Sequence, residues 1–304
     1  NKNYKIIIFE RNSMALFLTN TALQSCTRYM SNITSSLNTV YKRLASGKRI
    51  NSAKDDPAGF QIANRLTSQI NGYKQGNRNL NDGLSYAQAA EGALDETVNM
   101  LQRIRVLAIQ AANGTYDDGS RSAINAEVEQ LSLEITRIAK KANYAGIPLL
   151  SGGSKGVLIQ CSGQANDTIE IPCFSSGFTV SGLATYLNAE ASSFFETTAD
   201  GEFRFSLSTA QNAQDVLANI DQFINAVTAY QGTLGGVQNR FESAIRLNDV
   251  MAENLSDARS RIEDTDYAEE AANLAKLNIQ QQVCAMMMKQ AAQSKNIILQ
   301  LLQN

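Results

Sequence analysis

The sequence contains no histidine and no tryptophan, and only three of its 304 residues are proline: Pro57, Pro148 and Pro172. Without histidine, the chain has no Ser-His-Asp or Cys-His nucleophile system, no histidine metal site and no HExxH zinc motif. It also lacks the commonest general base. We therefore expect no enzymatic activity and no cofactor. Because proline interrupts helices, its scarcity permits very long ones.

Other absences narrow the class of protein. The four cysteines, Cys26, Cys161, Cys173 and Cys284, show no CxxC spacing, which argues against a zinc site. The net charge is −2 and no block of like charges occurs, so we expect no nucleic-acid partner. The longest apolar run near the start, Ile6 to Phe9, is too short for a membrane span or a signal-peptide core. We expect neither a membrane segment nor an ordinary cleaved signal.

Helical periodicity is the strongest signal present. Near the N-terminus, apolar residues alternate spacings of three and four, which is the heptad seam of a helix that packs along another helix. Its members are Leu23, Cys26, Met30, Ile33, Leu37, Val40 and Leu44. A similar seam near the C-terminus, interrupted by Gln281 and Lys295, comprises Leu274, Leu277, Cys284, Met288, Ala291, Ile298 and Leu302.

The interior of the chain repeats this pattern in three stripes. The first comprises Ala87, Ala90, Leu94, Val98, Leu101, Ile104, Ala108 and Ala111, and the second Ile124, Val128, Leu131, Ile135, Ile138 and Ala142. The third comprises Val216, Ile220, Phe223, Val227, Tyr230, Leu234, Val237, Phe241, Ala244, Met251, Leu255, Ala258 and Ile262, and only Asn248 breaks it. If continuous, the third stripe spans about 70 Å. The sequence predicts a mainly α protein, a long antiparallel helical rod with coiled-coil terminal helices.

Residues 143–209 show a different sequence pattern from the helical stripes on either side. The segment GVLIQCSGQANDTIEIP predicts a β-hairpin with its turn near Gln164 and Ala165, and Phe178 to Tyr186 and Gly201 to Leu207 add weaker strand or loop material. This is the small β insertion in the helical rod.

The predicted hairpin bears on the cysteines. Cys161 would face about Thr168, with Cys173 five residues further along, on the order of 17 Å away. A direct disulfide needs Cα atoms within about 7 Å, so we do not expect this bridge. Cys26 and Cys284 occupy seam positions and are interpreted as small buried hydrophobes.

The adjacent pair Asp55 and Asp56 has two interpretations. The stretch Ser52 to Asp55 fits the Ser-x-x-acid pattern of a helix start, and Asp56 equally suits an N-cap with Pro57 at the first helical position. A metal site would need further oxygen ligands, which the sequence does not identify. We therefore interpret the pair as a helix boundary, with Gly59 leaving room for close approach.

Several ordered motifs resemble bacterial flagellins. The N-terminal set is RLASGKRINSAKDDPAGFQIANRLTSQINGYKQGNRNLNDGLSYAQAAEGALDE, residues 43–96, followed by LQRIRVLAIQAANGT, residues 101–115. The C-terminal set is LGGVQNRFESAI, residues 234–245, and LSDARSRIEDTDYAEE, residues 255–270. The similarity covers roughly 14–150 and 216–304.

The resemblance implies a division of the chain. Residues 14–55 and 265–304 would form a terminal coiled-coil domain of the filament's inner tube, and 56–150 with 210–264 a helical rod of the outer tube. Residues 151–209 would form the hairpin, at 156–171, and a short variable surface segment, without large outer domains. Residues 1–13 have no counterpart in the family and are an extension or a translation artefact. The four cysteines also depart from the family's usual composition.

The implied function is structural. The family's members polymerise into the extracellular flagellar filament, the motility propeller, after export as unfolded chains by the flagellar type III system. Implied partners are further copies of the chain, an export chaperone, and the filament cap and hook-junction proteins. We expect the terminal seams to fold on joining the filament. The alternatives are a hook–filament junction protein of the same superfamily and a non-flagellar coiled-coil scaffold.

Many flagellins are also recognised by a host Toll-like receptor. On the matching motif, Arg103, Leu107 and Glu127 would occupy receptor-contacting positions, or equally serve subunit contacts. Val106 stands where the family usually carries an acidic residue, which would weaken recognition.

Overall fold

The structure is a computed structural model that describes residues 21–153, 155–189, 193–197 and 201–303, with the side chains of 294–303 left out. The expectations for residues 1–13, and for the side chains of Ile298 and Leu302, lie outside the described residues. The helices are α2 (Thr21–Ser46), α3 (Pro57–Ala111), α4 (Asp118–Lys141), α5 (Val180–Tyr186), α6 (Ala210–Glu263) and α7 (Tyr267–Gln303). The strands are β1 (Asn143–Tyr144), β2 (Ile147–Pro148), β3 (Val157–Gln160), β4 (Thr168–Ile171), β5 (Phe195–Thr197) and β6 (Phe203–Phe205). The predicted mainly α fold with a small β insertion is confirmed.

The chain forms two compact units. The first, called the terminal unit below, comprises residues 1–67 and 256–304, and the second, the central unit, comprises 68–255. The boundaries of these units lie within α3 and α6, whereas the helices themselves break at 47–56 and 264–266. The predicted division at residues 55/56 and 264/265 stays a prediction. No helix of the described chain has the length and apolar character needed to cross a membrane.

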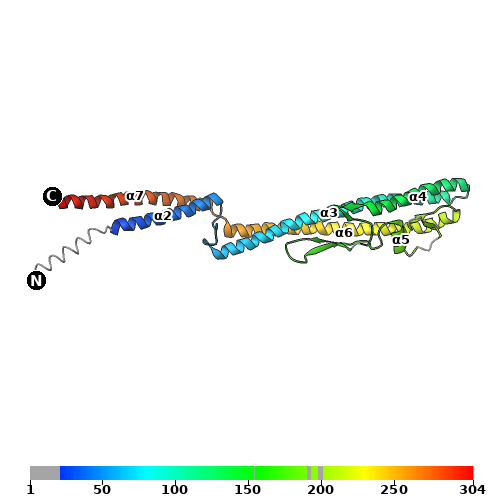
Figure 1. The fold of residues 1–304 in the computed structure, drawn as a ribbon, viewed down its shortest axis with the longest axis horizontal. Coiled ribbons are helices and arrows are strands. Elements are labelled where there is room, and N and C mark those ends of the chain that lie inside the picture. The colour runs from blue at the N-terminus through cyan, green and yellow to red at the C-terminus, as the bar shows by residue number, and fades with distance from the viewer. Residues whose placement is uncertain (1–20, 154, 190–192, 198–200, 304) are drawn as a thin grey trace. The chain divides into compact units, whose positions relative to one another are not determined.

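In the terminal unit, α2 and α7 lie side by side (Figure 1). Two contacts show that they run antiparallel. The Arg43 guanidinium near the end of α2 lies 3.4 Å from the carboxylate of Glu270 in the first turn of α7. Toward the other ends of both helices, the Cys284 thiol donates to the Cys26 carbonyl at 3.3 Å.

In the central unit, α3 and α6 pair antiparallel in a constant register. The side chain of Asn77 bonds to Asp249, that of Gln231 to Asp95, and the guanidinium of Arg105 to Asp221. An advance of 28 residues along α3, from 77 to 105, matches a retreat of 28 along α6, from 249 to 221. This register brings the predicted stripes of α3, α4 and α6 into one core, whose largest fully buried side chains include Phe178, Phe205, Phe223 and Phe241.

Near the C-terminal part of α6, the buried positions differ from those of the predicted stripe. Asn248, which interrupts the apolar series, is 5% exposed, whereas Met251 is 42% exposed. The prediction for Met251 is therefore wrong. Asn248 is buried because its amide donates to the carbonyl of Cys161 at 2.8 Å and to the side chain of Asn77 at 2.9 Å. A polar residue in the stripe thus bonds to the hairpin.

The predicted hairpin is confirmed as β3 paired antiparallel with β4. Its turn spans 161–167 and is wider than predicted, because Gln160 rather than Cys161 stands opposite Thr168. The Cys161 amide instead donates to the Asp167 carbonyl at 2.8 Å. The other antiparallel pairs are β1 with β2 and β5 with β6.

The hairpin packs closely on α3 at glycines. A Cβ on Gly76 would lie 1.8 Å from the Cys161 carbonyl oxygen, and one on Gly72 would lie 2.9 Å from the Cα of Gly163. Asn79 donates to the Gln160 carbonyl at 3.1 Å in the same region. Gly72 and Gly76 of α3 therefore allow the hairpin backbone to approach the helix closely.

The expectation of strand or loop at Phe178–Tyr186 is wrong, because most of that segment is α5. Thr179 caps the helix by accepting from the Gly182 amide at 2.9 Å, and Val180 and Leu183 are buried. The expectation for Gly201–Leu207 agrees with the structure, since it contains β6.

Candidate assembly interface

The predicted seams lie where α2 and α7 pair. Leu37 and Val40 are buried, and the other α2 seam residues, Leu23, Cys26, Met30, Ile33 and Leu44, are half-buried. On α7, Cys284 is buried, and Leu274, Leu277, Gln281, Met288 and Ala291 are half-buried. The seams are therefore covered largely within one chain, and their role in assembly stays a prediction.

A second apolar surface of the terminal unit remains open. Tyr29 of α2 is 66% exposed, and on α7 Ile279, Met286 and Met287 are 61%, 62% and 60% exposed. Val283 is 40% exposed beside them on the same helix. These five residues, called the open face below, are absent from both predicted seams. Among the described side chains of α2 and α7, the open face is thus an apolar surface that lies outside the predicted seams.

The seam contains one ion pair that the sequence analysis missed. Glu270 is only 5% exposed, and its carboxylate faces the Arg43 guanidinium at 3.4 Å. A buried carboxylate without a cation is costly, so the pair favours one register of α2 against α7. The sequence signal was present: Glu270 stands four residues before Leu274, in the heptad series itself.

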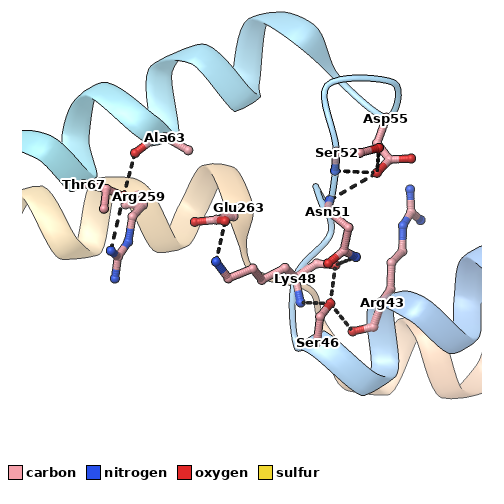
Figure 2. Close-up of polar contacts among 10 residues, drawn as sticks. All are labelled: Arg43, Ser46, Lys48, Asn51, Ser52, Asp55, Ala63, Thr67, Arg259 and Glu263. Atoms are coloured by element: carbon pink, nitrogen blue, oxygen red, sulfur yellow. Dashed lines mark hydrogen bonds and ion pairs between the residues drawn. The ribbon is translucent and has the colours of Figure 1, made fainter.

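The two breaks in the helices are joined by backbone hydrogen bonds. The Arg49 amide donates to the Glu263 carbonyl at 2.6 Å, and the Thr265 amide donates to the Gly47 carbonyl at 3.0 Å. Figure 2 shows the ion pair that accompanies them, in which the Lys48 ammonium lies 2.7 Å from the Glu263 carboxylate. The segments 47–56 and 264–266, called the junction below, therefore form one structure from both ends of the sequence.

The junction settles the interpretation of the two aspartates. Asp56 caps α3 by accepting from the amides of Ala58 and Gly59 at 3.1 and 3.0 Å, and Pro57 takes the first helical position. Asp55 instead closes the preceding turn, accepting from the amides of Asn51 and Ser52 and from the Ser52 hydroxyl (Figure 2). The Ser52 hydroxyl is the main cause that lowers the pKa of Asp55.

Two glycines fit this junction for different reasons. Gly47 has φ +71°, a conformation in which L side chains are strained, and its amide donates to the Arg43 carbonyl to end α2. Gly59 confirms the expected close approach, because a Cβ there would lie 2.7 Å from the Ile50 side chain. Ile50 is 2% exposed, so the glycine lets the loop pack on the start of α3.

The proposed receptor positions lie in the central unit. The Arg103 guanidinium and the Glu127 carboxylate form an ion pair at 2.6 Å between α3 and α4, with side chains 53% and 44% exposed. Leu107 is only 2% exposed and belongs to the core, whereas Val106 is 53% exposed. Arg103 and Glu127 are accessible together, and Leu107 lies beneath the surface. Their role as receptor contacts stays a prediction.

Further apolar side chains of the central unit are exposed. Val106 and Ile109 lie on α3, and Leu247, Val250 and Met251 on α6, with exposures from 42% to 57%. Their spacings of three and four place each group on one face of its helix. Within the described residues, no group of three or more histidine, cysteine, aspartate or glutamate residues is arranged to hold a metal ion.

Comparisons with known proteins agree with these features. Residues 17–155 match the model of the bacterial flagellin N-terminal helical region, and residues 217–302 match that of the C-terminal helical region. The chain is 32% identical to polar flagellin F of Vibrio parahaemolyticus serotype O3:K6, over 93% of this chain and 98% of that protein. It is 32% identical to flagellin B of Vibrio anguillarum with the same coverage.

A solved structure shares the fold. A putative flagellar hook-associated protein from Vibrio parahaemolyticus aligns with a TM-score of 0.53 and 15% identity, covering 69% of this chain and 100% of that chain. Because both terminal regions match the family models and near full-length relatives are flagellins, this chain belongs to the bacterial flagellin family.

Proposed function

We propose that copies of this chain polymerise into the bacterial flagellar filament, outside the cell, as its structural subunit. The observation that carries the proposal is the open face of α2 and α7, which α2–α7 pairing leaves uncovered. Full burial of a large apolar side chain stabilises by about 1.5–3 kcal/mol. Because 40–66% of each of the five side chains is still exposed, covering them supplies about 4–9 kcal/mol, against a cost of association of about 4–15 kcal/mol.

The exposed groups on α3 and α6 of the central unit support the same proposal. A contact between different faces of neighbouring copies is heterologous, and such contacts generate open helical filaments when the rotation does not close. Two separate sets of apolar residues, one in each unit, suit contacts that differ in kind. No catalytic step is part of this function.

Family membership supports the finer parts of the proposal. The chain would leave the cell unfolded through the flagellar type III system with an export chaperone, and assemble beneath the filament cap and beyond the hook-junction proteins. The filament would then act as a propeller. A role as a hook-junction protein is the second candidate, favoured only by the shared fold with the hook-associated protein.

The test is seeded polymerisation of the full chain. Filaments are depolymerised by heat, the soluble chain is mixed with filament fragments, and growth is measured by electron microscopy. We expect long filaments, whereas a junction protein would give none. Met286→Ser should slow elongation at unchanged helix content, while Gln282→Ser, an exposed polar position on the same helix, should not. Equal elongation of the two variants would remove the open face from the proposal.

Recognition by a host Toll-like receptor belongs to the same proposal in a narrower form. Arg103 and Glu127 are the exposed groups at the matched positions, and the apolar Val106 stands beside them. In a receptor reporter assay on soluble chain, Arg103→Ala should lower the response, and Val106→Asp should raise it. A response that neither substitution changes would exclude this surface.

A further inference from the structure

The pairing of α2 with α7 brings together two cysteines that are 258 residues apart in the sequence. The Cys284 sulfur lies 3.3 Å from the carbonyl oxygen of Cys26, and both residues are free thiols in this structure. Each also occupies a heptad seam position of its helix. The fold thus creates a thiol pair that sequence spacing alone does not reveal.

The distance suits a covalent bond. From standard bond lengths, the carbonyl oxygen of a residue lies about 2.4 Å from its own Cα, so the Cys284 sulfur is within about 6 Å of the Cys26 Cα. Helices packed about 8–10 Å apart, each with Cα atoms on a radius of about 2.3 Å, bring directly facing Cα atoms to about 3.4–5.4 Å from each other. A disulfide needs Cα atoms about 4.4–6.8 Å apart. A Cys284 sulfur within about 6 Å of the Cys26 Cα is compatible with this span.

One member of the pair, Cys26, is accessible from solvent. Cys26 is half-buried, and together with Cys284 it lines an open groove of about 330 Å³ between α2 and α7. Tyr29, Ile279 and Met287 line the same groove, and all three are at least 60% exposed. A small oxidant therefore reaches the Cys26 sulfur through this groove, whereas Cys284, which is 8% exposed, needs only to reach the mixed disulfide on Cys26.

The other two cysteines lack these properties. Cys161 stands opposite Asp167 in the hairpin, and Cys173 lies six residues beyond Asp167, past the end of β4 at Ile171, about 20 Å along an extended chain. Burial raises the pKa of the Cys161 thiol, which disfavours the reactive thiolate. Cys161 and Cys173 therefore serve as an internal control.

We propose that Cys26 and Cys284 form an intrachain disulfide that fastens α2 to α7 under oxidising conditions. The Cys26 thiolate attacks one sulfur of a low-molecular-weight disulfide, forms a mixed disulfide and releases one small thiolate. The Cys284 thiolate then attacks the Cys26 sulfur and releases the second. Two protein thiols are oxidised, the small disulfide is reduced to two thiols, and the two protons pass to the released thiolates.

The bond would change how the terminal unit behaves. In the reduced chain, only non-covalent contacts such as the Arg43–Glu270 ion pair hold α2 to α7. In the oxidised chain they stay joined, because the link closes a loop of more than 250 residues and removes many conformations from the unfolded chain. If the chain is exported unfolded, as proposed above, the bond forms only after export. The bond itself does not depend on polymerisation.

The experiment uses the full chain, both soluble and after seeding, treated with oxidised glutathione. Linked peptides are quantified by mass spectrometry without reduction. We expect the peptide that joins Cys26 to Cys284 to exceed each of the five other pairings at least about tenfold, at a rate independent of protein concentration. The Cys161→Ser/Cys173→Ser variant should behave like the parent, and the Cys26→Ser/Cys284→Ser variant should form no intrachain link.

Oxidation should also raise the thermal midpoint of the terminal unit by at least about 5 °C, and a reductant should reverse the shift. The proposal is overturned if the Cys26–Cys284 peptide does not exceed the other pairings in either form of the chain, or if links form mainly between chains. If seeded growth fails, that failure counts against the proposed filament only. The disulfide proposal is then tested on the soluble chain.

Discussion

Gly76 offers a sharp test of how the hairpin sits on α3. A Cβ at this position would lie 1.8 Å from the Cys161 carbonyl oxygen and 2.5 Å from its carbonyl carbon. Even a close C···O contact is about 3.3 Å long, so the hairpin backbone must retreat by about 1.5 Å in Gly76→Ala. That retreat breaks the 2.8 Å hydrogen bond from the buried Asn248 amide to the same carbonyl.

The expected loss follows from three contributions. A buried amide left without its partner costs about 1–3 kcal/mol, and overpacking costs about 1–3 kcal/mol. The higher helix propensity of alanine offsets about 1 kcal/mol. We therefore expect Gly76→Ala to lower the free energy of unfolding of the central unit by about 1–5 kcal/mol.

Gly92 supplies the matched control in the same helix. No atom lies within 4 Å of a Cβ built there, so Gly92→Ala should raise the free energy of unfolding by up to about 1 kcal/mol. Both variants are measured by urea titration of soluble chain with far-UV circular dichroism, and by amide hydrogen exchange across residues 157–171. If Gly76→Ala proves as stable as Gly92→Ala, the described packing of the hairpin on α3 is wrong.

Three further predictions concern the terminal unit. Asp56→Ala removes the cap of α3 and should cost about 1 kcal/mol in urea titration, whereas no change would contradict the capping role. Because the Ser52 hydroxyl lowers the pKa of Asp55, this carboxylate stabilises the fold above its unfolded pKa of about 3.9, and the benefit is lost as pH falls through the lower folded pKa. The stability advantage of the parent over Asp55→Asn should therefore vanish in acid titration, and an advantage that grows on acidification would refute this assignment. Arg43→Ala leaves the Glu270 carboxylate buried without its cation and should cost about 1–3 kcal/mol, measured as a lower thermal midpoint of the terminal unit; an unchanged midpoint would show that the pair contributes nothing.

The helices were predictable because their apolar residues repeat over many turns. The stripes of α3 and α4 hold along their whole length in the structure. The failure at Met251 arises because Asn248 bonds to the Cys161 carbonyl of the hairpin and to the side chain of Asn77 on α3, and so takes the buried position. Periodicity identifies apolar faces and gives no information on a polar group that is satisfied by a distant segment.

The short helix α5 shows a related limit. Its seven residues make only about two helical turns, which are too few to show a clear apolar period. Its start depends on one capping hydroxyl, that of Thr179. The hairpin was found from its turn residues, but its register was wrong by one residue at Cys161, because the turn is longer than two residues.

The candidate interface was predictable only in part. Heptads located the seam residues, and the pairing of α2 with α7 then covered them within one chain. The open face around Met286 and Met287 followed only from knowing which side of α7 the partner helix occupies. The junction bonds and the thiol pair join residues more than 200 positions apart, so no local pattern indicates them.

The junction has a consequence for any redesign of this chain. Gly47 and Arg49 exchange backbone bonds with Thr265 and Glu263, so the two turns hold each other in shape although they lie at opposite ends of the gene product. Adding or removing a residue in one turn shifts its donors past acceptors that have not moved. Insertions or deletions in one turn therefore require a compensating change in the other. Chimaeras that take the two turns from different parent sequences should lose these backbone hydrogen bonds before their helix packing is disturbed.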